Sequence, residues 1–302
     1  MQAASGQHYP EGALYLVATP IGNLADISLR ALYCLRLADT IACEDTRHTQ
    51  SLLRAYGIDK AGHQLLALHQ HNEEEAAQNV LDRLRTGQRV AYVSDAGTPC
   101  ISDPGARLVA VVRQQGVRCI PLPGASSVTT LLSAAGCVTG HADAGGFVFH
   151  GFLPSKALER TRAVQLLQKE ERTTLILEAP HRIEALAQAL AELGARLVTV
   201  GRELTKQFEE IATLPAHDLP AWFAADANRL RGEFALVIHP QPATTDAQQD
   251  TQTLRTLHLL LAELPLKTAV KLATEITGAP KNALYESALA WKELQKEKQK
   301  EK

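Results

Sequence analysis

Short apolar segments alternate with helix-length amphipathic segments through the first half of the chain, and this alternation constrains the fold more than any other feature. Short segments rich in β-branched, aliphatic and aromatic residues are typical of buried strands. We expect strands at residues 13–19, 40–43, 65–68, 89–93 and 119–122, and helices at 28–37, 51–56, 73–85, 106–114 and 128–135. Strands that alternate with helices build a mostly parallel sheet covered on both faces, so the first half is predicted to be a three-layer α/β domain.

The polar segment at 94–105, called the central loop below, connects a predicted strand to a predicted helix. It contains two glycines, two prolines, two aspartates and three hydroxyl residues, which favours tight turns and exposed backbone N–H groups. Open α/β sheets bind small ligands in the loops at the carboxyl ends of their strands. The spacing fits neither GxGxxG nor a Walker A box, so a dinucleotide or a nucleoside triphosphate is not the expected ligand. The alternative is an ordinary turn-rich connection.

A small and polar segment at 136–146 marks a domain boundary. Beyond it, apolar segments occur at 147–154, 173–177, 197–200 and 232–238, the last expected to be antiparallel to its neighbour, with helices at 156–171 and up to residue 193. Three further helices are expected at 253–264, at 266–277 and from 282, followed by a frayed tail. The predicted organisation is a disordered N-terminus (1–12), two α/β domains (13–122 and 123–240), a linker (241–252) and a C-terminal helical domain (253–302).

Charge and cysteine content exclude several classes of protein. The formal net charge of -2 gives no electrostatic sign of a nucleic-acid partner, so an RNA site would have to be a local patch. The five cysteines never occur as C-x-x-C, which favours reduced thiols in the cytoplasm over a disulfide framework. His69 and His71 lack carboxylates at recognisable ligand spacing, so no metal is expected. No secretory signal or membrane-spanning run is found, and we expect a cytoplasmic protein without a membrane partner.

Seven motifs follow one another along the chain. They are LVATPIGNL at 16–24, ACEDTR at 42–47, SDAGTPCISDPG at 94–105, PLPGAS at 121–126, GFLP at 151–154, EAPHR at 178–182 and GRELTK at 201–206. With these motifs in this order, the chain resembles the ribosomal RNA small subunit methyltransferase I family, the bacterial 16S rRNA cytidine 2′-O-methyltransferases of the tetrapyrrole methylase superfamily. The resemblance covers about residues 13–238, and the small helical C-terminal domain also fits that family.

The resemblance implies two α/β domains with an S-adenosylmethionine site in the cleft between them, and a homodimer that acts on 16S rRNA or the small ribosomal subunit. By position, the resemblance assigns cofactor binding to residues of three loops: Thr19, Pro20 and Gly22 in the first, Ala96, Gly97, Thr98 and Ile101 in the second, and Ser126 and Ser127 in the third. It also assigns Leu153 and Ala179 of the second domain, which would pack around the adenine. One departure matters. Tetrapyrrole-type members carry Gly-Gly-Asp-Pro where this chain has Ala-Gly-Thr-Pro at 96–99, which favours the rRNA branch.

In the implied reaction, the main role of the protein is to align the reactants, because the methyl donor is already activated. A ribose 2′-OH is a weak acid, so its proton must pass to a general base or a polarised water. We expect Asn23, Glu44 and Arg47 to assist, with Glu44 or Asp45 near the 2′-OH and Arg47 on a phosphate. The alternatives are that the cluster at 44–48 caps a helix and that Asn23 is a turn residue.

Other features leave alternatives open. Polar residues follow two strands of the second half. Glu178, His181 and Arg182 would either contact the substrate or cap a helix. Arg202, Glu203 and Lys206 would either contact the substrate or form ion pairs. The C-terminal helices would dock RNA, support a dimer or form a solvated appendix. Two other functions remain, a methyltransferase of a small tetrapyrrole and a non-enzymatic ribosome-assembly factor.

Overall fold

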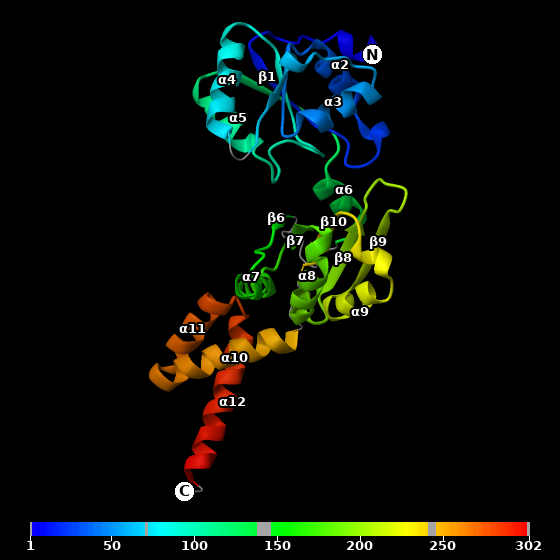
Figure 1. Ribbon diagram of the computed structural model, residues 1–302. Coiled ribbons are helices and arrows are strands. Elements are labelled where there is room, and N and C mark those ends of the chain that lie inside the picture. Colours follow the sequence, from blue (N-terminus) through cyan, green and yellow to red (C-terminus); the bar gives the residue numbers. More distant parts are fainter. Residues whose placement is uncertain (1, 70–71, 138–145, 241–245, 301–302) are drawn as a thin grey trace. The chain divides into compact units, whose positions relative to one another are not determined.

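The computed structural model describes residues 2–69, 72–137, 146–240 and 246–300 (Figure 1). Residue contacts divide the chain into two compact units. The first contains residues 1–138 and 143–240, and the second contains residues 139–142 and 241–302. Both β-sheets belong to the first unit, and the described part of the second is helical.

The first sheet has five strands in the order β3-β2-β4-β1-β5. The strands are β1 (Ala13–Val17), β2 (Thr40–Cys43), β3 (Leu65–Ala67), β4 (Val90–Val93) and β5 (Arg118–Leu122). Each neighbouring pair is parallel, which confirms the predicted sheet. Because parallel strands end on the same side, the loops that follow them gather at one edge of the sheet.

Helices cover both faces of this sheet, so the predicted three layers are confirmed (Figure 1). One face packs against α2 (Leu29–Leu37) and α3 (Thr46–Ala55), and the other against α4 (Glu73–Arg85) and α5 (Gly105–Gln114). Successive side chains of a strand point to opposite faces. In β1, Tyr15 therefore packs in the first layer of helices and Leu14 in the second.

The second sheet also has five strands, in the order β6-β7-β10-β8-β9. They are β6 (Phe147–Phe152), β7 (Thr173–Glu178), β8 (Leu197–Arg202), β9 (Glu210–Pro215) and β10 (Phe234–Ile238). Strands β6 and β7 are parallel, with a register shift between Phe149 and Gly151. Strand β10 is antiparallel to both β7 and β8, as expected, whereas edge strand β9 was not predicted.

Helices also cover both faces of the second sheet. One face packs against α7 (Ala157–Lys169), α8 (Ile183–Leu190) and α9 (Leu219–Ala224), of which α9 was not predicted. The other packs against α6 (Ser127–Ala134), whose Leu131 lies among Leu175 and Val237. Ile21, from the loop after β1, joins this cluster. The boundary predicted between residues 122 and 123 stays a prediction, and the packing of α6 on the second sheet supports it.

The second unit contains α10 (Asp246–Glu263), α11 (Leu266–Thr277) and α12 (Lys281–Lys300). Their shared core contains Leu257, Leu261, Ala269, Val270, Ala273, Leu284 and Ala288. The prediction of a linker at 241–252 is wrong from Asp246 onward, because α10 begins there, and residues 241–245 lie outside the described residues. The tail expected to fray continues α12 as far as Lys300.

Two further predictions differ from the structure near the N-terminus. Residues 1–12 were expected to be disordered, but α1 (Gln2–Ser5) forms there and Tyr9 is 8% exposed in the core. Helix α3 begins at Thr46 and not at residue 51, because Asp45 caps it: one carboxylate oxygen accepts the N–H groups of Arg47 at 2.8 Å and His48 at 3.3 Å. Among the described residues, no helix is both long and apolar enough to cross a membrane.

Candidate functional site

A cavity of about 360 Å³ lies where the loops of the first sheet meet the second sheet. This volume falls in the range of small-molecule sites, which is roughly 300–1,000 Å³. The first sheet's loops and α6 contribute Ile21, Ala96, Ile101, Ser102 and Ser127, and the second sheet and its loops contribute Phe152, Leu177, Glu178, Ala179, Pro180, Leu204, Glu233, Phe234 and Ala235. Among these lining residues, the charged ones are Glu178 and Glu233 alone. With no Lys or Arg in the described lining, the cavity favours a ligand with an apolar body over a phosphate.

The central loop is held in a strained shape beside this cavity. Cys100 and Ser102 have φ angles of 70° and 64°, which non-glycine residues rarely adopt. The carboxylate of Asp103 holds the turn, because it accepts the N–H groups of Cys100 at 2.6 Å and Gly105 at 2.7 Å. The Tyr92 hydroxyl donates to the same carboxylate at 3.1 Å. These bonds to a single carboxylate fix the loop at the point where Ile101 and Ser102 line the cavity.

Three loops of the first sheet are joined by hydrogen bonds. Thr19, after β1, and Gly97, after β4, exchange backbone hydrogen bonds of 3.0 and 3.1 Å. The Thr19 hydroxyl also donates to the Ser94 carbonyl at 3.1 Å. The Thr98 hydroxyl donates to the carbonyl of Ala125, after β5, at 2.9 Å. The residues that sequence reasoning grouped in these loops therefore form one connected edge.

The structure brings some of the predicted cofactor residues to the cavity and not others. The predicted residues that line it are Ala96, Ile101, Ser127 and Ala179. Thr19, Gly97 and Thr98 hold the loop edge described above, Pro20 is buried, and Ser126 is the N-cap residue of α6. Gly22 lies against the side chain of Lys206, and Leu153 is 4% exposed in the core of the second domain. The whole set stays a prediction of cofactor contacts.

The predicted catalytic residues lie at the same edge but outside the lining of the cavity. Glu44 accepts the N–H of Asp95 at 3.3 Å, directly before the lining residue Ala96. Burial raises the pKa of the Glu44 carboxyl and the charges of Asp95 and Asp103 add to this, while the hydrogen bond from Asp95 opposes it. The other two candidates differ. Asn23 accepts the N–H of Ala25 at 3.0 Å in a local turn, whereas the Arg47 side chain is 92% exposed.

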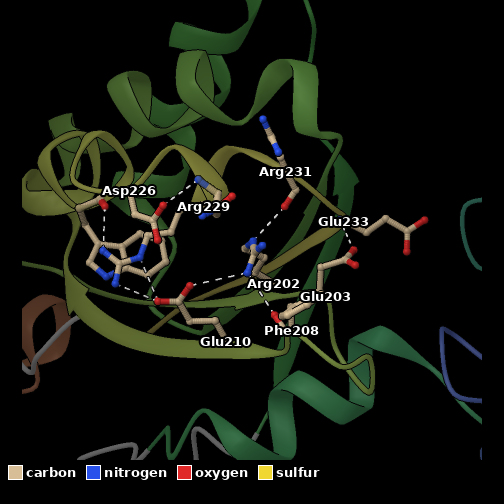
Figure 2. A network of polar contacts seen from close by, with 10 residues as sticks. Arg202, Glu203, Phe208, Glu210, Asp226, Arg229, Arg231 and Glu233 are labelled. Atoms are coloured by element: carbon tan, nitrogen blue, oxygen red, sulfur yellow. Dashed lines mark hydrogen bonds and ion pairs between the residues drawn. The ribbon is translucent and has the colours of Figure 1, made fainter.

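The loop between β8 and β9, at residues 203–209, is fixed by polar contacts, and Figure 2 shows those of Glu203 and Phe208 within the surrounding network. Lys206 donates to Glu203 and to the lining residue Glu233, each at 2.9 Å. Burial opposes ionisation of Glu203, but the bonds from Lys206 and from the N–H of Glu233 outweigh it, so the pKa of Glu203 lies below its usual value. Arg202 donates to the Phe208 carbonyl at 3.1 Å. The ion-pair role considered for this motif is therefore confirmed.

Sequence reasoning missed several lining residues. Ser102 belongs to the central loop but was not singled out, and Phe152, Leu177, Leu204, Glu233 and Phe234 come from the second domain. Glu178 was considered as a substrate contact or a cap; it is 2% exposed and lines the cavity. A polar residue at the end of a predicted strand was the available signal for Glu178. No comparable signal marks Phe152 or Glu233, which reach the cavity through tertiary packing.

The family model described as Tetrapyrrole (Corrin/Porphyrin) Methylases matches residues 13–220, and that described as RsmI C-terminal HTH domain matches residues 247–292. A protein of Escherichia coli O157:H7 named ribosomal RNA small subunit methyltransferase I is 47% identical over 281 residues, covering 92% of this chain and 95% of that protein. The chain belongs to the ribosomal RNA small subunit methyltransferase I family. The resemblance inferred from the motifs is thereby confirmed.

Another member of the ribosomal RNA small subunit methyltransferase I family, from Pseudomonas aeruginosa, is 45% identical over 284 residues, covering 92% of this chain and 97% of that protein. Among solved structures, a cobalt precorrin-4 methyltransferase is similar with a TM-score of 0.55 and 20% identity, covering 77% of this chain and 98% of that chain. A diphthine synthase has a TM-score of 0.55 and 16% identity, covering 75% and 90%. These structural likenesses confirm the predicted fold class.

Proposed function

We propose that this protein transfers a methyl group from S-adenosylmethionine to the ribose 2′-oxygen of a cytidine in the decoding region of 16S rRNA. The observation that carries the proposal is a cavity with the predicted central loop on one wall, in a chain whose relatives are named rRNA small subunit methyltransferases. The relatives' names support an RNA substrate over a small tetrapyrrole, and the Ala-Gly-Thr-Pro string at 96–99 agrees with that choice.

The lining of the cavity suits S-adenosylmethionine. The ligand carries a flat adenine, and the lining offers an apolar wall that contains Phe152, Ala179 and Pro180. The buried backbone of the loop edge offers small residues and short hydroxyl side chains for the methionine end. A phosphate-rich ligand would instead require cationic partners, and the described lining contains neither Lys nor Arg. The residues present therefore fit the methyl donor.

In the proposed reaction, the ribose 2′-oxygen forms a bond to the methyl carbon while the carbon–sulfur bond breaks. The electron pair of that bond goes to sulfur, which leaves S-adenosylhomocysteine, and the 2′-OH proton passes to a base. Glu44 is the candidate base, because its carboxyl is partly buried at the loop edge and its pKa is raised. Arg47, exposed in the first turn of α3, would contact an rRNA phosphate, and Asn23 would orient the hydroxyl.

Replacing Glu44 tests the proposed base. Glu44→Gln should lower kcat by about 100-fold or more while the Kd for S-adenosylhomocysteine stays nearly unchanged, since general-base catalysis contributes typically 10²–10⁴-fold. Because the pKa of Glu44 is raised, its carboxylate takes up a proton at a higher pH than an ordinary glutamate. The wild-type rate should therefore begin to fall on acidification above the ordinary glutamate pKa of about 4.3. The matched control is Asp45→Asn, which keeps a capping oxygen on α3 and should keep the rate. Equal rates for Glu44→Gln and wild type would remove Glu44 from the mechanism.

We also propose that the C-terminal helices dock rRNA. The match of residues 247–292 to the RsmI C-terminal HTH model supports this, since helix-turn-helix units commonly place their second helix against nucleic acid. Gly278, with a φ of 70°, ends α11 and allows the turn into α12. Lys281, Asn282 and Tyr285 are exposed in the first turns of α12, and they supply a cation, an amide and an aromatic face suited to RNA.

The homodimer and the cytoplasmic location are proposed on the family resemblance. Light scattering of the purified protein should give twice the mass of one chain, and a mass of 32.7 kDa at all concentrations would contradict the dimer. Cell fractionation should recover the protein with ribosomal subunits in the cytoplasm. Recovery in a membrane or secreted fraction would contradict that location.

A further inference from the structure

Two charged side chains form a buried brace in the second-domain wall of the cavity. Glu178 ends β7, and Arg182 follows one turn later in the EAPHR motif. The Arg182 Nε lies 3.0 Å from the Glu178 Oε1, and their side chains are 22% and 0% exposed. The Arg182 N–H is not directed at the carboxylate, so the contact is an ion pair and not a hydrogen bond. We call this pair the Glu178–Arg182 brace.

The Glu178–Arg182 brace connects two backbone segments that line the cavity. The Glu178 carboxylate accepts the N–H of Ala179 at 2.9 Å, at the end of β7. The Arg182 guanidinium donates to the carbonyl of Leu153, just after β6. These contacts lie next to the lining residue Phe152 and at the lining residue Ala179. The ion pair therefore joins the backbone after β6 to the backbone after β7.

The brace holds the end of β6, where the pairing with β7 resumes after an irregularity. The register of the two strands shifts between Phe149 and Gly151, and Gly151 has a φ of 68°. Phe152, the last residue of β6, is 49% exposed and lines the cavity. Beyond the shift, Phe152 pairs with Leu177 of β7, and the contact from Arg182 to the Leu153 carbonyl adds a further tie to the residue directly after that last pair.

Stability alone does not account for the brace. Burying two charges costs free energy that their attraction often fails to recover, and apolar residues of similar volume are commonly as stable. Here the cost is larger, since the Glu178 Oε2 and the Arg182 Nε are buried without a hydrogen-bond partner among the described residues. The brace is therefore a poor stabiliser of the fold, and what it does provide is a fixed distance between the ends of two strands.

We propose that Glu178 and Arg182 are positioning residues that set the width of a slot for a flat heteroaromatic ring. The wall that they hold is apolar, with Phe152, Ala179 and Pro180, which suits a planar ring better than an amino acid group. The inference rests on the proposed function: in S-adenosylmethionine the planar group is the adenine, so the brace serves the adenosyl half of the ligand. It acts on cofactor affinity and not on the methyl-transfer step.

The test compares Glu178→Gln and Arg182→Lys with the wild type in the full-length protein. Glutamine keeps an acceptor for the Ala179 N–H without the charge, and lysine cannot contact both the carboxylate and the Leu153 carbonyl. Isothermal titration should show S-adenosylhomocysteine and 5′-methylthioadenosine, which lacks the amino acid end, weakened by a similar factor of about 10- to 100-fold. The kcat at saturating donor should stay close to wild type while KM for the donor rises. Because either single change breaks the same brace, the double variant should bind the two ligands only slightly less tightly than the single variant with the lower affinity.

Glu184→Gln is the control, because Glu184 is an exposed residue in the first turn of α8. Its affinities should match those of the wild type. The proposal is overturned if both brace variants bind the two ligands as tightly as the wild type, or if kcat falls while KM is unchanged. If one variant does not fold, as judged by its thermal unfolding without ligand, the other decides. If the wild type binds neither ligand, the proposed function fails and not the brace.

Discussion

Gly105 shows how closely single residues determine the central loop. A Cβ at this position would lie 2.0 Å from the Cε1 of Tyr92, whose ring is fully buried between β4 and the helices on that face. Tyr92 in turn donates its hydroxyl to Asp103, the carboxylate that holds the strained turn. Burial of the ring and the nearby charge of Asp103 raise the pKa of Tyr92, so its hydroxyl stays protonated and remains a donor. The glycine, the ring and the carboxylate therefore depend on one another.

Gly105→Ala should destabilise the protein, because the ring of Tyr92 would have to move within a packed core. Overpacking of this kind costs typically 1–3 kcal/mol in the free energy of unfolding. Donor affinity should fall as well, since displacement of Tyr92 disturbs the hydrogen bond to Asp103. Urea denaturation and titration with S-adenosylhomocysteine measure the two effects. Gly62→Ala is the control, because a Cβ there meets no atom within 4 Å and should change neither quantity; an equally stable Gly105→Ala protein would contradict this account.

The same scale explains which site residues sequence reasoning could find. Polar and glycine-rich segments after strands indicated the loops, because the carboxyl ends of parallel strands gather at one edge of a sheet. Within those loops, the family resemblance assigned Ala96, Ile101 and Ser127, which line the cavity. Of two neighbouring residues, the resemblance selected Leu153, whereas Phe152 lines the cavity and Leu153 is in the core. The register of β6 beyond its shift sets which of the two side chains reaches the cavity, and no sequence pattern predicts that shift.

At the scale of the elements, prediction from sequence succeeded where burial was continuous. Strands β1, β2 and β4 of the first sheet are almost completely buried, so they appear as nearly unbroken apolar runs. Strand β9 is different: it lies at an edge, alternates between partly buried and exposed residues and contains no apolar run, so it was missed. The predicted start of helix α10, at residue 253, is too late because the first turns of the helix, from Asp246, are polar and resemble a linker in composition.

Helix α2 offers a test of a local signal that was predicted correctly. Ser28 caps it by accepting the N–H of Ala31 at 3.0 Å. Ser28→Ala leaves that N–H without its partner and should lower the free energy of unfolding by about 1 kcal/mol. Chemical denaturation of the two proteins gives the difference. Ser51→Ala is the control: it removes an exposed hydroxyl that donates to the Arg47 carbonyl within α3, and it should lower the free energy of unfolding far less. Equal losses of free energy for the two variants would show that the Ser28 cap does not stabilise the start of α2.

For the whole molecule, the division into two units separates donor binding from the proposed RNA docking. The cavity is lined within residues 21–235, and the core of the helical unit is formed by residues 257–288. The family match likewise falls into two parts, at 13–220 and 247–292. A chain that ends at residue 240 should therefore keep the cavity and lose the helices that we propose to dock rRNA.

Titration of the shortened chain, residues 1–240, with S-adenosylhomocysteine should give the Kd of the full-length protein. Methylation of small subunits should fall strongly, mainly through a higher KM for the subunit, because lost docking removes binding and not chemistry. The full-length protein with Lys281→Ala and Tyr285→Ala is the matched variant, since it keeps the helices and changes only exposed residues of α12. Unchanged KM in both proteins would exclude the helical unit from substrate binding.

The central claim is that the cavity presents a methyl donor to one ribose of the small-subunit rRNA. Its most direct test is to incubate the purified protein with S-adenosylmethionine labelled in the methyl group and small subunits from cells that lack the protein, and to map the label by nuclease digestion and mass spectrometry. We expect label on the 2′-oxygen of a cytidine in the decoding region, and loss of that label with Glu44→Gln. Absence of label from wild-type protein that binds the donor, or label on a base in place of a ribose, would contradict it.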